Sequence, residues 1–222
     1  FMDHVIKVTF PAFSRMQGKT KDLSRAVTES IFFVSFLVFP SVFGFLTLVP
    51  LLIVIIPRYG KWEPAVVSLT LISVNTLFAA ATTQLTNLLN SIGKIKITFR
   101  LMVLWTILTW ILVPYLAKKY GVDGAAFGYM LVGLTSVIAI YISYKYVKFS
   151  LTDSIFKPLF ASVVMFSVIT AVRNFLSNDV ISLVIIIFVG ALTYFTFSYF
   201  LYGSKLIENV RKITSEIFVK KN

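Results

Sequence analysis

The chain has 222 residues, of which 58% are hydrophobic and only 14% charged, with a net charge of +12 and a mean hydropathy of +0.88. About a quarter of the residues of a soluble domain are charged, so this composition excludes an ordinary soluble protein. The absence of cysteine excludes disulfides, thiolate zinc sites and thiol catalysis. Nucleic acid is not an expected partner, because the excess positive charge lies between apolar stretches, where membrane insertion requires it.

The first 30 residues read as the end of a preceding helix plus a cytoplasmic interfacial helix. Phe1–Phe10 resemble the cytoplasmic end of a helix, and no basic and apolar signal region follows a starting methionine. We therefore expect the chain to be the C-terminal part of a longer membrane protein. Ser14–Ser30 are polar, but Leu23, Val27 and Ile31 recur at helical spacing, as in a helix that lies on the membrane surface.

Six stretches that lack any charged residue follow. Each is long enough, or nearly so, for the roughly 20 apolar residues that cross a bilayer as a helix. The fold class predicted is therefore an all-α polytopic membrane protein, a bundle of six transmembrane helices. Four of them belong to residues 31–146 and two more to residues 147–204, while residues 205–222 form an amphipathic cytoplasmic tail. The stretches are Ile31–Ile56, Ala65–Ile92, Leu101–Ala117, Gly124–Tyr144, Pro158–Val172 and Val180–Ser204.

Positive charges alternate in number between these stretches. Of the 21 Lys and Arg residues, 16 fall in the two terminal segments and the even turns, and five in the other three turns. Loops rich in Lys and Arg stay in the cytoplasm. The distribution predicts that both termini of this segment are cytoplasmic and that the protein lies in the inner membrane of the cell.

The first span contains two prolines, Pro40 and Pro50. Each removes a backbone hydrogen bond, so we expect a kinked helix. The simpler interpretation is bending against neighbouring helices, which membrane helices tolerate. The functional interpretation is a hinge for alternating access.

The second span has the richest polar content. At 100° per residue, the amide and hydroxyl side chains of residues 75–91 fall within about 200° of arc, opposite an arc of Val, Leu, Phe and Ile side chains. Amides exposed to lipid have no partner, so this face points into the bundle or into a water-filled cavity. It is either helix-to-helix hydrogen bonding or an uncharged passage suited to hydroxyl-rich substrates such as sugars. The predicted passage residues are Asn75, Thr83, Gln84, Asn87 and Asn90.

Three ionisable residues lie near the start of the chain. Asp3 and Lys7 are four residues apart and can pair on one helix face, and His4 is the only histidine. Ionisable groups inside a membrane are functional candidates, so a coupling or substrate-contact role is one interpretation. The other is a position at the membrane–water boundary.

Enzyme signatures are missing. No span contains Asp or Glu, so paired carboxylates cannot do acid–base chemistry within the membrane. There is no Walker loop, no Gly-rich dinucleotide motif and no metal-ligand cluster in the sequence. We therefore expect no enzyme, no catalytic residue, no metal and no cofactor. A Gly124-x-x-x-Gly128 pattern predicts close helix packing instead of a ligand site.

Three short motifs resemble those of a known family. Phe10–Arg15 is similar to the P-x-(L/F)-S-(R/K) turn that follows the eighth helix of bacterial oligosaccharide flippases. Leu89–Lys94 resembles their L-x-(A/S)-x-G-K junction, and Tyr120–Ala126 their (F/Y)-G-x-x-G-(A/V)-A turn. The motifs occur in the order expected for the last six of fourteen helices. The chain thus resembles the C-terminal part of a flippase of the multidrug/oligosaccharidyl-lipid/polysaccharide exporter superfamily.

This resemblance implies a function. Members of the family move an undecaprenyl-diphosphate-linked oligosaccharide from the inner to the outer leaflet. Two six-helix lobes rock around a cationic or hydrophilic cavity, driven by an ion gradient or by substrate supply. The partners implied are the lipid-linked oligosaccharide, membrane lipids and a missing N-terminal lobe of the same protein. Because the six spans contain no Arg or Lys, the sequence leaves open which residues neutralise the diphosphate.

Other functions stay open at this point. One is a relative that exports another lipid-linked precursor or a drug. Another is a membrane-embedded glycan polymerase or glycosyltransferase, which would need a large outer loop with Arg or carboxylates, whereas the outer loops are short. A third is a purely structural membrane subunit, for which the amide face of the second span would be superfluous.

Overall fold

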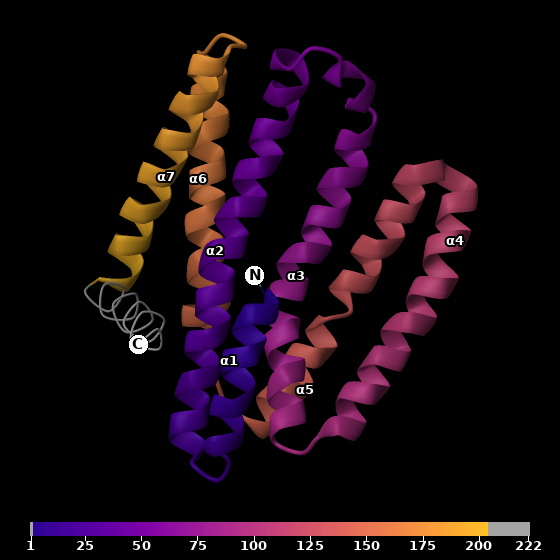
Figure 1. Ribbon diagram of the computed structural model, residues 1–222, viewed down its shortest axis with the longest axis vertical. Coiled ribbons are helices and arrows are strands. Elements are labelled where there is room, and N and C mark those ends of the chain that lie inside the picture. The colour runs from indigo at the N-terminus through magenta and orange to yellow at the C-terminus, as the bar shows by residue number, and fades with distance from the viewer. Residues whose placement is uncertain (1, 204–222) are drawn as a thin grey trace.

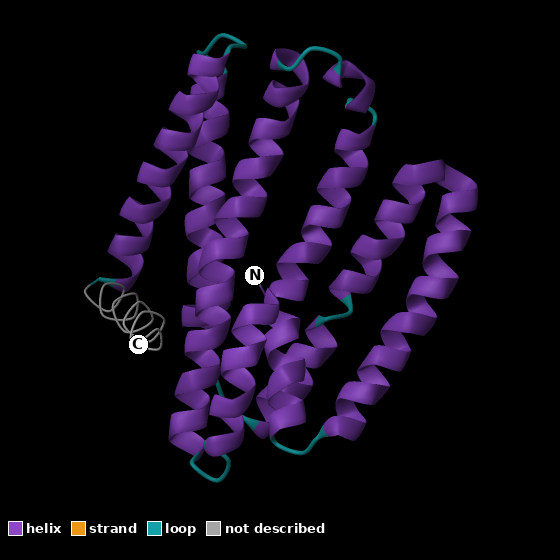
Figure 2. Ribbon diagram, viewed as in Figure 1, coloured by secondary structure: helices purple, strands orange, loops and turns teal. Residues whose placement is uncertain are grey.

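The computed structural model describes residues 2–203, with the backbone alone for residues 2–4, so the predicted tail at 205–222 lies outside the described residues. Helices and loops make up the whole described part (Figure 2), which confirms the all-α class. The elements are α1 (Met2–Arg15), α2 (Thr20–Ile55), η1 (Tyr59–Trp62), α3 (Ala65–Ser91), α4 (Ile95–Leu134), α5 (Val137–Tyr146), η2 (Thr152–Phe156), α6 (Lys157–Arg173) and α7 (Val180–Tyr202).

Five helical segments are long and apolar enough to cross a membrane. One of them, Ile95–Tyr146, is 52 residues long and joins α4 to α5. Its helix reverses at Gly121, where φ is 66° and ψ is −143°, so it forms two antiparallel arms (Figure 1). These arms contain the third and fourth predicted spans, which gives the six passes expected from the sequence. The protein is therefore a multi-pass membrane protein.

The two arms of this α4 hairpin pack closely because of its glycines. A Cβ atom on Gly124 would collide with the carbonyl oxygen of Leu116 on the opposite arm. A Cβ on Gly128 would lie 3.1 Å from the Cα of Val113. The prediction that the Gly124-x-x-x-Gly128 pattern serves close helix packing is therefore confirmed.

The residues predicted to lead into the first span form part of that span. Thr20–Ile55 is one continuous helix of 36 residues, so residues 20–30 are its first turns and not a separate interfacial helix. The apolar stripe of Leu23, Val27 and Ile31 is buried in a core cluster with Leu85 and Leu88 of α3. These three side chains pack against α3, whereas the sequence predicted that they would face the membrane surface.

Helices α6 and α7 pack on α2 through a second core cluster. The cluster includes Phe32 and Phe36 of α2, Met165 and Ile169 of α6 and Tyr194 of α7, whose ring centroid lies 5.1 Å from that of Phe36. Within a membrane, side chains of this size stabilise the contact between helices through van der Waals packing. The cluster fixes the last two passes to the first.

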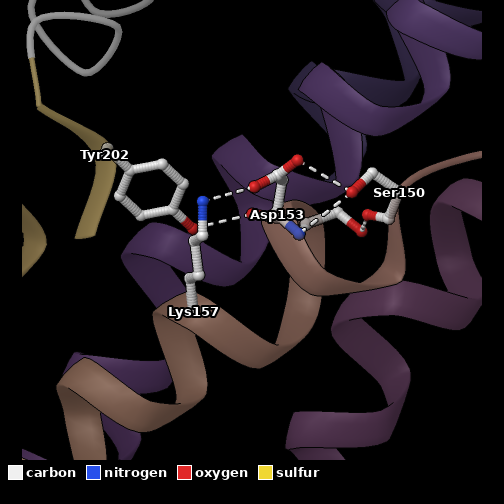
Figure 3. A network of polar contacts seen from close by, with 5 residues as sticks. Ser150, Asp153, Lys157 and Tyr202 are labelled. Atoms are coloured by element: carbon white, nitrogen blue, oxygen red, sulfur yellow. Dashed lines mark hydrogen bonds and ion pairs between the residues drawn. The ribbon is translucent and has the colours of Figure 1, made fainter.

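A polar network closes this unit at one end (Figure 3). The Tyr202 hydroxyl donates to the backbone carbonyl of Asp153 over 2.7 Å. The Lys157 ammonium lies 2.6 Å from the Asp153 carboxylate and 5.0 Å from the centroid of the Tyr202 ring. The Ser150 hydroxyl donates to the other carboxylate oxygen over 2.8 Å. The end of α7 is thereby tied to the short π-helix η2.

The loops gather at two ends of the bundle. Figure 1 shows the α1–α2 turn, the α3–α4 turn and the end of α5 at one end, and the loop with η1, the Gly121 reversal and the α6–α7 loop at the other. The alternation of charge-rich and charge-poor loops along the chain therefore separates them in space, as the six-pass topology requires.

Candidate functional site

The polar face of α3 divides between two neighbours. Gln84 and Asn87 are buried and point toward α1. The Asn87 amide nitrogen donates to the Thr9 hydroxyl over 2.8 Å, and Thr9 donates to the Gln84 amide oxygen over 3.4 Å. The amide nitrogen of Gln84 has no partner. These two side chains make hydrogen bonds between helices in this structure.

Asn75 and Thr83 face the other way, into a cavity of about 370 Å³ between α3 and the α4 hairpin. No charged side chain lines it. Asn75 touches Gly133 so closely that a Cβ on that glycine would collide with the amide oxygen. The lining residues are Asn75, Ala79, Thr82, Thr83, Thr86, Met102, Trp105, Thr109, Tyr129, Val132, Gly133 and Ser136.

Hydrogen bonding gives this cavity a defined chemistry. The hydroxyls of Thr82, Thr83 and Thr86 donate to backbone carbonyls one turn earlier, over 2.6, 2.7 and 3.1 Å. A hydroxyl whose hydrogen is already donated in a hydrogen bond can still accept hydrogen bonds through its lone pairs. The buried indole nitrogen of Trp105 has no partner and is a donor only. The cavity thus offers hydroxyl acceptors without net charge, together with the aromatic rings of Trp105 and Tyr129.

The fifth predicted passage residue, Asn90, lies near the end of α3 outside this cavity. Its amide oxygen is buried and has no hydrogen-bond partner. The structure therefore brings Asn75 and Thr83 together in one cavity, places Gln84 and Asn87 against α1, and leaves Asn90 apart.

The ionisable residues of the N-terminal segment lie on α1. Figure 1 places the start of α1 about halfway along the bundle, between α2 and α3. Lys7 is exposed, and at 1.5 Å per residue it lies about 12 Å along the helix from Arg15. Asp3 and His4 are in the same helix, and their side chains lie outside the described residues.

Both prolines of the first span lie inside α2, which continues through them. The carbonyl that would accept the missing Pro40 N–H is that of Phe36, four residues earlier. The Tyr194 hydroxyl of α7 donates to this carbonyl over 2.8 Å. A side chain 158 residues away thus satisfies the acceptor that Pro40 leaves free.

Sequence reasoning missed the α4 side of the cavity. Trp105, Thr109, Tyr129 and Ser136 lie in charge-free spans, where aromatic residues usually face lipid or the headgroups. Only the packing of the hairpin against α3 identifies them. In residues 2–203, apart from the side chains of residues 2–4, no group of three or more His, Asp or Glu side chains is placed to hold a metal ion.

Comparison with known proteins gives two matches. Residues 1–67 match the sequence model of a family described as "Polysaccharide biosynthesis protein". The fold matches that of the lipid II flippase MurJ in an inward closed conformation, with a TM-score of 0.74 and 20% sequence identity over 91% of this chain. The match spans 43% of the MurJ chain, which is less than half its length. No curated protein sequence matches.

The matched segment covers α1, α2 up to its end and the loop with η1. The structural match extends over nearly all the remaining helices. Together these matches show that residues 1–67 are similar to a family of polysaccharide biosynthesis proteins and that the fold is similar to that of the lipid II flippase MurJ.

Proposed function

We propose that this chain is part of a transporter that flips a polyprenyl-diphosphate-linked oligosaccharide across the cytoplasmic membrane for polysaccharide export. The observation that carries the proposal is the uncharged cavity between α3 and the α4 hairpin, which is lined by hydroxyl and amide groups together with apolar side chains. Sugars present many hydroxyls that both donate and accept, and their ring faces pack on aromatic side chains. Threonine acceptors and the rings of Trp105 and Tyr129 suit such a group.

The proposed passage combines the two sides of α3. Asn75 and Thr83 contact the glycan in the cavity. Gln84, Asn87 and Asn90 join the passage when α1 moves relative to α3, which breaks the bonds through Thr9. The unpartnered atoms of Gln84 and Asn90 support this, because buried amides left without partners are costly in a purely structural interface.

The diphosphate needs a cation, and Lys7 is the candidate. It is exposed on α1, the helix that also holds Thr9. An ionisable side chain at this depth is expected to face a partner lobe or a hydrated cavity. Asp3 and His4 on the same helix are proposed to contact substrate or couple transport to an ion. Pro40 and Pro50 are the proposed hinge in α2.

The partners in this proposal are the lipid-linked substrate, membrane lipids and the N-terminal lobe. Both termini of the segment are assigned to the cytoplasm from the distribution of Lys and Arg. Reporter fusions after Trp62 should read outside and fusions after Phe149 inside. The reverse result would overturn the proposed orientation and leave the fold unchanged.

A second candidate substrate is another lipid-linked precursor. The fold match to a protein named as a lipid II flippase favours this alternative over drug export. A glycan polymerase or glycosyltransferase is not favoured, because no described loop offers a group of carboxylates. These relatives are transporters, and the proposal assigns no enzymatic reaction to the chain.

The test uses the full-length protein in a cell that depends on it for glycan export. Thr83→Val removes a cavity acceptor at nearly constant volume, and Asn75→Leu removes an amide. Each should lower export roughly five- to thirtyfold, since losing one hydrogen bond to a polar group costs on the order of 1–2 kcal/mol.

Thr70→Val is the matched control for the cavity variants. Thr70 lies on the same helix, makes the same bond to a carbonyl one turn earlier over 2.9 Å, and is exposed outside the cavity. Export should stay unchanged in this variant at equal protein level. If Thr83→Val and Asn75→Leu also export normally, the cavity does not contact the glycan and the proposal is wrong.

A further inference from the structure

Five positively charged side chains from two separate segments gather at the end of the bundle that holds the α3–α4 turn. Three come from that turn and the start of α4, and two from the end of α5 and the residues after it. The segments touch, since the ammonium of Lys94 lies 5.1 Å from the ring centroid of Tyr146 in α5. All five side chains are exposed. This basic cluster consists of Lys94, Lys96, Arg100, Lys145 and Lys148.

Tyrosine rings hold part of the basic cluster in place. Tyr141, Tyr144 and Lys145 share one face of α5, and Lys148 lies two residues past the end of this helix. The Lys145 ammonium lies 4.6 Å from the Tyr141 ring centroid and that of Lys148 4.1 Å from Tyr144. The Tyr144 ring in turn packs edge-on against buried Phe149. Cations held over rings keep N–H donors for an anion and lose little freedom on binding.

The cluster has no carboxylate partner among the residues that the structure describes. Two other cations, Lys157 and Arg25, pair with the carboxylates of Asp153 and Glu29. The N-terminus of α4 opens within the cluster, and no side chain caps it. Uncapped N–H groups at a helix N-terminus favour an anion. Charge and backbone therefore point to the same kind of ligand.

An apolar surface adjoins the cluster along α4. Phe99, Met102, Val103 and Ile107 are exposed directly after the start of this helix. In a membrane this surface faces acyl chains. An anion bound at the cluster is therefore next to hydrocarbon, which favours a lipid headgroup over a free phosphate.

We propose that the basic cluster and its tyrosines form a binding site for the phosphate of an anionic phospholipid, with the acyl chains along Phe99 and Val103. Zwitterionic headgroups fit less well, because their ammonium group would lie among five uncompensated cations. The site is distinct from the glycan cavity and does not depend on the proposed transport function.

The experiment uses the full-length protein in detergent with added phosphatidylglycerol or phosphatidylcholine, and bound lipid is counted by native mass spectrometry. Wild type should retain phosphatidylglycerol in preference to phosphatidylcholine. The triple variant Lys94→Gln, Lys145→Gln, Lys148→Gln should bind phosphatidylglycerol about 100-fold more weakly, given the usual contribution of each basic residue near anionic lipid.

The control removes three lysines from the opposite end, Lys61→Gln, Lys118→Gln and Lys119→Gln. Lys61 and Lys119 also lie over rings, 5.7 Å from Trp62 and 5.2 Å from Tyr120. This variant should bind phosphatidylglycerol within about threefold of wild type. Equal loss in both triple variants would show a general charge effect and overturn the site. Inorganic phosphate that displaces the lipid at equal concentration would assign the cluster to free anions instead.

A single position tests the ring contact without changing charge. Tyr144→Phe keeps the ring under Lys148 and should retain most of the binding, whereas Tyr144→Leu removes it and should weaken binding several-fold. Equal binding by these two variants would overturn the role of the tyrosines in the site.

Discussion

The α6–α7 pair and the α4 hairpin attach to the bundle in different ways. The pair is fixed by an aromatic cluster on α2 and by the hydroxyls of Tyr194 and Tyr202, which reach backbone carbonyls in other elements. The hairpin is tight within itself, through Gly124 and Gly128, but leaves a polar cavity against α3. The tyrosine hydroxyls tie the pair to other elements, although the Ser198 hydroxyl of α7 is buried without a partner. The hairpin instead borders a cavity. We propose that the pair serves as scaffold and that the hairpin with α3 forms the site.

The largest effect should come from the glycine that closes the hairpin. Gly124→Val places side-chain atoms on the carbonyl of Leu116 and should destabilise the protein by about 3 kcal/mol, through overpacking that the rigid backbone cannot relieve. Thermal unfolding in detergent measures this. Gly60→Val is the control, because a Cβ there meets nothing within 4 Å. Equal melting temperatures for the two variants would show that the hairpin arms are not held as described.

A double-mutant cycle tests whether the Tyr194 hydroxyl compensates for the hydrogen bond that Pro40 removes from α2. Tyr194→Phe leaves the Phe36 carbonyl without a donor and should cost about 1–3 kcal/mol. Pro40→Ala restores a backbone N–H for the same carbonyl. Tyr194→Phe should therefore cost much less in the Pro40→Ala background than alone. Additive losses would mean that the hydroxyl does not compensate for the proline.

The ion pair and the hydrogen bond at Asp153 should differ in how their contributions to stability depend on salt concentration. Asp153→Asn removes an ion pair with Lys157 that is partly exposed, and it should cost less than about 1 kcal/mol, with the loss vanishing at high salt. Tyr202→Phe removes a hydrogen bond to a carbonyl and should cost about 1 kcal/mol at any salt concentration. Unfolding at low and high ionic strength distinguishes them. A salt-dependent loss for Tyr202→Phe would contradict the assignment.

The smallest effect concerns the start of α7. Asp179 accepts a hydrogen bond from the Ser182 backbone N–H over 2.7 Å, and the Ser182 side chain and backbone hold the pKa of this carboxyl below its usual value. A lowered folded pKa stabilises the fold above the unfolded pKa, and this contribution is lost as the pH falls through the folded pKa. Asp179→Asn keeps a cap that does not titrate. Its stability should vary less between pH 7 and pH 3 than that of wild type.

The sequence predicted the membrane spans, but it did not predict which neighbouring helix each polar side chain faces. Charge-free runs near 20 residues have few alternatives to membrane helices, and Gly121 and Gly124 marked the reversal. A helical wheel defines the polar face of α3 without saying which neighbour covers it, so Gln84 and Asn75 were grouped together although they face opposite sides. Trp105 looked like any aromatic residue in a span. Its role, and that of Tyr194, depends on contacts between distant segments.

The reversal of α4 takes place at Gly121 without a connecting loop. At this end of the bundle the exposed residues 118–122 of the hairpin are held in helical turns. The loop with η1 between α2 and α3, with exposed Gly60 and Trp62, presents chain outside the long helices at the same end. Because proteases bind extended chain, they should cut the η1 loop before the hairpin.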